Sequence, residues 1–195
     1  LTGLSKGGFA DCRSLKEIVV PESVTRIGYG AFQNCTSLAS VRLPERVEEF
    51  GNGDGFGMFA NNLALKEVRL PQGIRALSGT FTGCENLQSV LLPDSVTDLG
   101  QMTFSDCKSL TKVNLPAGLE KIHAQAFFNC KAYPFAVYGN GIYWGNEQNP
   151  YFALITIEYG EERVELTLHP DSRMIADQIS CWISNSVLEI PEGVR

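Results

Sequence analysis

The sequence has little of what enzymes and metal sites use. It contains only two histidines, His123 and His169, and they lack the i, i+4 spacing of a metal-binding pair on a helix. Neither histidine has a serine and an aspartate arranged around it by a catalytic motif. No glycine-rich loop opens a helix, so a phosphate-binding loop is missing as well. We therefore expect a protein that is not an enzyme, with no catalytic residue, no bound metal and no cofactor.

Charge and hydropathy exclude two further classes of partner. The formal charge is −6 and the sequence has no basic cluster, which argues against a nucleic-acid surface. No run of about 18 apolar residues occurs, so we expect no insertion into a membrane. A chain of 195 residues that is 44% hydrophobic fits one folded domain.

What the sequence does contain is a phrase that returns five times. A Phe is followed at three-residue steps by Cys or Asn, then Leu, then Ile or Val, and two positions later an apolar residue precedes a Pro. The copies are Phe9 to Pro21, Phe32 to Pro44, Phe59 to Pro71, Phe81 to Pro93 and Phe104 to Pro116. Self-similarity at a period of 20 to 50 residues is the signature of a solenoid.

A single repeat cannot fold alone. Its inward side chains, about seven, contribute roughly 1.5–3 kcal/mol each, whereas fixing about 23 residues of backbone costs roughly 1–2 kcal/mol apiece. Stacking fuses the apolar columns of neighbouring coils into one core. The Leu-x-x-Val-x-Leu part alternates as a short strand does, and Pro ends it because Pro cannot donate to a ladder. We expect a β-rich solenoid with a parallel sheet of short strands, turns or 3₁₀ pieces on the other side, and little regular α-helix.

The repeat resembles a known family. The Leu-x-x-Val-x-Leu core and the Cys or Asn column look like a leucine-rich repeat, and the phrase AFQNCTSLASVRLPERV at residues 31–47 is similar to the BspA-like repeats of bacterial surface proteins. This resemblance implies a right-handed leucine-rich-repeat superhelix, an extracellular or cell-surface location, and binding of a host or matrix protein. The sequence itself carries no signal peptide.

The repeat also predicts the domain organisation. We expect a single leucine-rich-repeat domain over 1–195 with about eight coils, one of them an atypical coil at 137–171. Leu1 and Val194 both occupy the first apolar position after the proline. Because the chain begins and ends at the same phase of the repeat, we expect it to be part of a longer array.

One column of the repeat holds most of the cysteines. It consists of Cys12, Cys35, Cys84, Cys107 and Cys130, with Asn62 in the remaining copy. A position that accepts Cys or Asn indicates a small group that hydrogen-bonds turn backbone. We interpret these residues as buried free thiols, although adjacent coils also bring Cys84 and Cys107 near the separation that a disulfide needs.

Two segments depart from the repeat. The third copy is preceded by four extra residues in Gly51–Gly57, which indicates a flexible bulge, with a weak calcium site at Asp54 as the alternative. Beyond Cys130, turn signals flank residues 142–144 and a strand-like run follows at 151–159, which predicts one inserted β-hairpin. Its aromatic residues fill the core where a standard coil is missing or bind a protein or a carbohydrate. The candidate aromatic hairpin consists of Tyr143, Trp144 and Tyr151.

The outward strand positions offer a second candidate surface. One column combines apolar residues with arginines where water is expected, and this composition is typical of protein interfaces. The candidate residues are Val19, Arg42, Arg69, Leu91 and Asn114. We expect a non-catalytic protein-binding or adhesion module of an exported bacterial surface protein. A structural spacer without a ligand, and carbohydrate binding by the aromatic hairpin, remain alternatives, and the sequence predicts no oligomeric state.

Overall fold

The computed structural model describes residues 1–51, 53, 55, 57–123 and 125–132, together with the backbone of four strands at 135–138, 141–146, 149–157 and 172–180. The chain forms two compact units. The first comprises Leu1–Leu119 and Gln125–Tyr133, and the second comprises Glu120–Ala124 and Pro134–Arg195. In the described residues every regular element is a β-strand. That part of the chain includes no helical segment with the length and hydrophobicity needed to cross a bilayer.

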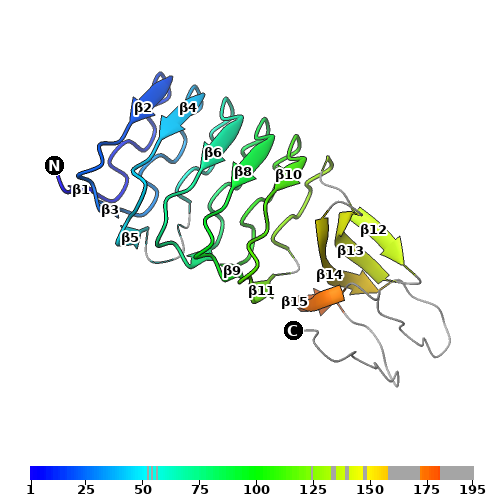
Figure 1. The fold of residues 1–195 in the computed structure, drawn as a ribbon. Helices are drawn as coiled ribbons and strands as arrows, with labels where there is room; N and C mark the ends of the chain where they lie inside the picture. The colour runs from blue at the N-terminus through cyan, green and yellow to red at the C-terminus, as the bar shows by residue number, and fades with distance from the viewer. Residues whose placement is uncertain are drawn as a thin grey trace. The chain divides into compact units, whose positions relative to one another are not determined.

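The first unit is a parallel β-solenoid. One strand per coil occupies the Leu-x-x-Val-x-Leu part of the repeat, as predicted, and lies on one side of the stack (Figure 1). These strands are β2 (Glu17–Val19), β4 (Ser40–Arg42), β6 (Glu67–Arg69), β8 (Ser89–Leu91) and β10 (Lys112–Val113). They pair parallel as β2–β4 and as β6–β8–β10, and equivalent repeat positions face each other in the register.

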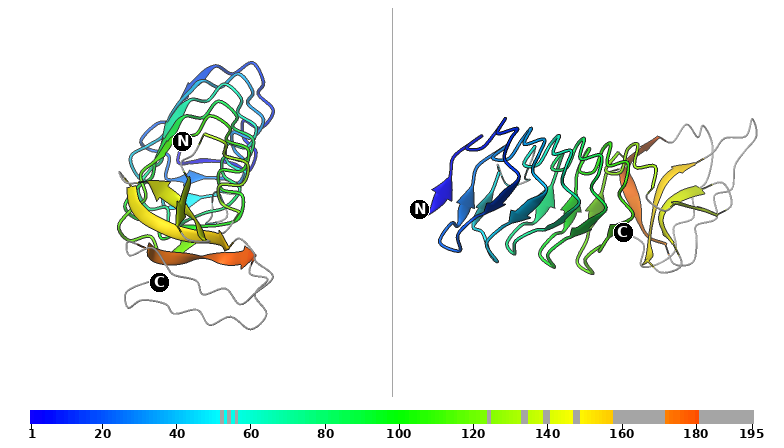
Figure 2. Two further views of the ribbon diagram at one scale, coloured as in Figure 1. Left: turned by 90° about the vertical axis from the view of Figure 1, so that its right-hand side faces the viewer. Right: turned by 90° about the horizontal axis from the view of Figure 1, so that it is seen from above.

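A second series of strands follows the prolines. The Val-x-x-Ile part of each repeat forms a two-residue strand, which also agrees with the sequence. In the first unit the series is β1 (Gly3–Leu4), β3 (Arg26–Ile27), β5 (Glu49–Phe50), β7 (Ala76–Leu77) and β9 (Asp98–Leu99). The strand at the same repeat position in the next copy, β11 (Lys121–Ile122), belongs to the second unit. The pairs β1–β3, β3–β5 and β7–β9 are parallel. Tight turns close each coil, and Figure 2 shows the coils of this unit one behind another.

The core of the solenoid is a stack of phenyl rings. Neighbouring rings lie 5.0–5.8 Å apart between centroids, and their planes differ by 2–25°. The stack consists of Phe9, Phe32, Phe59, Phe81, Phe104 and Phe127, and all but Phe9 are buried. The repeats therefore merge their apolar columns into a shared interior, as the energetics of a single unit demand.

The cysteine column forms hydrogen bonds between coils. The buried thiols of Cys35, Cys84, Cys107 and Cys130 each donate to the carbonyl of the Phe in the preceding coil, at Sγ–O distances of 2.9–3.2 Å. The five described cysteines are free, so Cys84 and Cys107 form no disulfide. Burial raises the pKa of Cys84 and of Cys130 to about 12. These thiols stay protonated near neutral pH and act as donors.

The second unit contains a four-stranded sheet. Its strands are β12 (Phe135–Tyr138), β13 (Gly141–Asn146), β14 (Asn149–Ile157) and β15 (Ser172–Ser180). The neighbours β12–β13 and β13–β14 are antiparallel, whereas β14–β15 is parallel. The predicted hairpin corresponds to β13 and β14, and the sheet extends it by one strand on each side.

Ala136 and Tyr138 stand where the repeat spacing predicts the next parallel strand of the solenoid, and this prediction is wrong. Tyr138 pairs with Gly141 in an antiparallel register, so β12 and β13 run in opposite directions. The atypical coil expected at 137–171 continues into residues 158–171, which lie outside the described residues, as do residues 181–195.

Candidate functional site

The strands of the solenoid present one residue inward and its two neighbours outward. Val68, Val90 and Val113 point into the core and are buried. The outward column that the sequence singled out has its apolar members in water, since Val19 is 67% and Leu91 is 48% exposed. Arg42 and Arg69 stand between them in the column and are exposed as well. The structure thus brings four of the five candidate residues onto one face.

Asn114 has a different role. Its side-chain oxygen accepts a hydrogen bond from the Leu92 amide at 2.6 Å, and its side-chain nitrogen donates to the Leu92 carbonyl at 2.9 Å. The amide group therefore takes the place of a backbone partner just beyond β10. We do not count it among the groups that a ligand can use.

The parallel ladder is interrupted between β4 and β6. At the neighbouring junctions the residue after each strand donates to the next coil, from the Val20 amide to Arg42 at 2.8 Å and from the Leu70 amide to Leu91 at 3.1 Å. In the described part of the chain, the equivalent bond from Leu43 to Arg69 is missing. The two-residue strands β5 and β7 are not paired either.

Other contacts hold these two coils together. Arg46 and Gln72 form an isolated parallel bridge just after the prolines. On the turn side, the Phe32 amide donates to Met58 at 3.1 Å and the Asn34 amide donates to Ala60 at 2.8 Å. The coil of β6 is the one that carries the four extra residues, and we attribute the lost strand pairing to the longer path that they impose.

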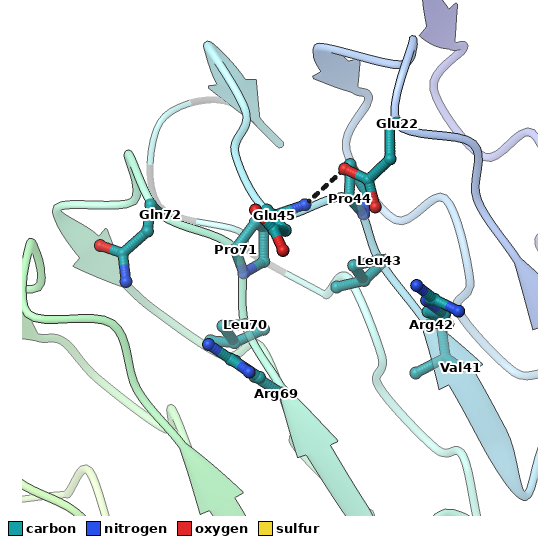
Figure 3. Close-up of a pocket in the computed structure, with 10 residues that line it drawn as sticks. All are labelled: Glu22, Val41, Arg42, Leu43, Pro44, Glu45, Arg69, Leu70, Pro71 and Gln72. Carbon is teal, nitrogen blue, oxygen red and sulfur yellow. Dashed lines mark hydrogen bonds between the residues drawn. The ribbon is translucent and has the colours of Figure 1, made fainter.

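The interruption opens a groove of about 340 Å³ on the strand side (Figure 3). We call it the β4–β6 groove. It is lined by Glu22, Val41, Arg42, Leu43, Pro44, Glu45, Arg69, Leu70, Pro71 and Gln72. Val41 is half-exposed here, whereas its equivalents in the next three coils are buried. A second hollow of about 600 Å³ adjoins it on the same face and reaches Leu91.

Charge is distributed unevenly along the groove. The guanidinium groups of Arg42 and Arg69 lie at one end, and Glu22 and Glu45 lie at the other, beyond the prolines (Figure 3). The Glu22 carboxylate accepts a hydrogen bond from the Glu45 amide at 2.9 Å. Within the described residues neither guanidinium makes an ion pair or a hydrogen bond. Both arginines are therefore available to an outside anion.

The other candidate sites are the metal site, the histidines and the aromatic hairpin. In the described residues, no group of three or more His, Cys, Asp or Glu side chains could hold a metal ion. Asp54, His169 and the side chains of Tyr143, Trp144 and Tyr151 lie outside them. The backbone of the aromatic hairpin is described, and there Trp144 pairs with Ala153 across β13 and β14.

Sequence reasoning missed a polar ladder on the turn side. The residue before each Cys or Asn of the column has a positive φ angle, and its side chain bonds to its neighbours along the stack. Asn34 donates to Asp11 at 3.2 Å, Asn61 donates to Asn34 at 2.9 Å, and Asn129 donates to Asp106. The signal was present, because Asp or Asn precedes this position in five of six copies and Gly83 does so in the sixth.

Comparisons with known proteins agree with this geometry. A family model described as a BspA type leucine rich repeat region matches residues 2–134 in six copies. Among curated proteins, none matches the chain.

Solved structures share the fold. A T. pallidum leucine-rich repeat protein is 29% identical with a TM-score of 0.61, and the match covers 68% of this chain and 60% of that one. A leucine-rich repeat protein from Eubacterium ventriosum is 26% identical with a TM-score of 0.57, over 73% and 39% of the two chains. The pneumococcal vaccine antigen PcpA, 21% identical with a TM-score of 0.51 over 71% and 32%, shows the likeness of the fold alone. The chain thus spans 60% or less of the length of these proteins.

Proposed function

The chain belongs to the BspA-type leucine-rich repeat family, and from this premise we propose that it is a non-catalytic protein-binding module that acts through the outward face of its strand column. The observation that supports this most is the column itself. Val19 and Leu91 expose apolar surface beside two arginines that have no partner in the described residues. Aromatic or aliphatic surface next to Arg is typical of protein interfaces.

We further propose an extracellular or cell-surface location and a host or matrix protein as the partner. Both proposals rest on the family, because the repeats of this sequence resemble the BspA-like repeats of bacterial surface proteins. Leucine-rich repeats stack into extended surfaces, and such surfaces suit recognition of another protein better than a small molecule.

The experiment is a binding screen on purified host and matrix proteins, measured by biolayer interferometry. The variant Val19→Asp plus Leu91→Asp removes the apolar members of the column. A control variant, Leu63→Asp plus Met102→Asp, changes two apolar residues on the turn side whose side chains are also exposed, at 42% and 41%. We expect the column variant to weaken binding at least about tenfold and the control to leave it unchanged.

Two results would contradict the proposal. Equal loss in both variants would indicate a general effect on the fold, and unchanged binding by the column variant would place the interface elsewhere. If no protein of the panel binds, the repeats act as a spacer. A glycan array with Trp144→Ala tests the carbohydrate alternative, because loss of a glycan signal in that variant alone would assign binding to the aromatic hairpin.

A further inference from the structure

We propose that the β4–β6 groove binds an extended acidic segment of a partner protein, in which two nearby carboxylates meet Arg42 and Arg69 and apolar side chains flank them. The inference rests on the proposed function, since it specifies the partner chemistry of the same face.

The arginine pair supplies the charge complementarity. Arg42 and Arg69 occupy the same repeat position in adjacent coils, and both line the groove. A guanidinium binds a carboxylate through two parallel hydrogen bonds, which fixes direction as well as charge. Two like charges side by side repel each other until an anion neutralises them. A pair of carboxylates therefore gains from both guanidiniums.

The order of residues along the column indicates which residues should flank the carboxylates. It runs Val19, Arg42, Arg69 and Leu91, that is, apolar, basic, basic and apolar. A complementary segment is apolar, acidic, acidic and apolar. At the far end of the groove, Glu22 and Glu45 repel an acidic ligand and so direct its carboxylates toward the arginines.

The broken ladder adds backbone groups to the site. The Leu43 amide and the Arg69 carbonyl lack the partner that their equivalents have at the regular junctions. Backbone groups without a partner favour a ligand that can bond to them, and an extended peptide offers both donors and acceptors. A volume of about 340 Å³ is at the low end for ligand pockets, which suits a few side chains of a peptide.

A long polyanion fits the same face poorly. The neighbouring outward column exposes Glu17 and Glu67, and Glu67 lies in the same strand as Arg69. Nucleic acid or a sulfated glycan would bring many negative charges against these carboxylates and against a chain of net charge −6. A short acidic peptide places its charge only where the arginines are.

The test uses end-blocked, fluorescein-labelled peptides and fluorescence anisotropy. The first peptide, Leu-Ser-Glu-Ser-Glu-Ser-Leu, spaces its glutamates two residues apart because alternate residues of an extended chain point to one side. The second carries Gln at both Glu positions, and the third carries Lys. We expect the glutamate peptide to bind at least about tenfold more tightly than the glutamine peptide, and salt to weaken it.

Two charge-reversed variants locate the binding. Arg42→Glu plus Arg69→Glu should weaken the glutamate peptide at least about tenfold and gain affinity for the lysine peptide. Arg26→Glu plus Arg75→Glu makes the same change in net charge at two exposed residues, one in β3 and one just before β7, and should change neither affinity. Equal effects of the two variants, equal affinity for the glutamate and glutamine peptides, or no binding of the glutamate peptide would each overturn the groove assignment.

These outcomes separate the groove from the function it refines. If the Val19→Asp plus Leu91→Asp variant loses a protein partner while the Arg42→Glu plus Arg69→Glu variant keeps it, the column binds proteins and the acidic-segment inference is wrong. If the glutamate peptide binds as expected and no protein of the panel does, the groove stands and the panel result contradicts the proposed host or matrix partner.

Discussion

Two neighbouring junctions of the solenoid are built differently. Between β6 and β8, the coils share three residue pairs of one strand pairing, a backbone bond from Leu70 to Leu91, and a thiol hydrogen bond from Cys84 to the Phe59 carbonyl. Between β4 and β6, the strand pairing and its backbone bond are missing from the described residues, and Asn62 stands in the cysteine column. Both side-chain polar atoms of Asn62 are buried without a hydrogen-bond partner.

The phenyl stack, by contrast, crosses both junctions unchanged. Phe59 lies 5.5 Å from Phe32 on one side and 5.5 Å from Phe81 on the other, with nearly parallel rings. The apolar column therefore holds neighbouring coils together even where the strand ladder does not. Polar groups that the ladder would otherwise use are then left for another role.

The largest expected effect comes from cutting the stack at the weaker junction. Phe59→Ala should lower the free energy of unfolding by about 3–5 kcal/mol, the usual loss for a buried Phe. Because the strand ladder between the coils of β4 and β6 is missing from the described residues, unfolding should also split into two transitions. Chemical denaturation followed by circular dichroism measures both effects. Phe104→Ala is the control, and it should lower stability within a single transition; one transition in both variants would contradict the difference between the junctions.

Alkaline pH should destabilise the thiol column. Cysteine ordinarily ionises near 9.0, whereas burial raises the pKa of Cys84 and of Cys130 to about 12 in the folded chain. Their contribution to stability is complete below about pH 9 and is lost as the pH rises toward 12, because only the unfolded chain releases these protons. At pH 10 the loss is on the order of 1 kcal/mol per thiol. Urea unfolding under reducing conditions at pH 8, 9 and 10 measures it, and Cys84→Ala should have a shallower pH dependence.

Restoring a thiol at the interrupted junction should stabilise it. Asn62→Cys removes two buried polar atoms without partners and provides a donor toward the preceding Phe carbonyl, as in the other coils. We expect a gain of about 1–2 kcal/mol in the free energy of unfolding. The reverse change at the regular junction, Cys84→Asn, should cost a similar amount. A loss of stability in Asn62→Cys would show that its amide has a partner after all.

The smallest effect concerns the polar ladder on the turn side, which crosses the interrupted junction and stops at Gly83. Gly83 has a φ angle of +73°, and a Cβ there would meet Asn61 Oδ1. Gly83→Ala should therefore lower the melting temperature. Gly83→Asn adds the same Cβ, but Asn tolerates this backbone conformation and its amide can donate to Asn61 Oδ1 once that side chain has shifted, so it should lower the melting temperature less than Gly83→Ala. Equal losses of melting temperature in the two variants would show that the introduced Asn does not extend the polar ladder to Asn61.

The sequence predicted most of the solenoid because every repeat contains the full pattern of apolar residues and proline that defines a strand. The alternation around Val68 or Val90 identifies a strand, and Pro71 or Pro93 shows where it ends. Exposure of Val19, Arg42, Arg69 and Leu91 follows from the same alternation, and the structure confirms it. These features depend on local spacing, which a single copy displays.

The interruption could not be predicted in the same way, because strand pairing is a property of two coils together. The segment from Leu65 to Leu70 matches the repeat, yet it does not pair with the strand of the preceding coil. We attribute this to the four extra residues that precede the third copy. The role of Asn114 was missed for a similar reason, since its partner belongs to another coil. The antiparallel pairing of β12 with β13 could not be predicted either, because Ala136 and Tyr138 continue the spacing of the repeat.

The missing ladder has a mechanical consequence. A pull across the stack loads each junction between the described coils, and the junction without strand hydrogen bonds resists it least. Tension would part the coils of β4 and β6 before the neighbouring described coils and widen the space beside Arg42 and Arg69. The strength with which this groove holds a ligand would then depend on the load that the chain carries.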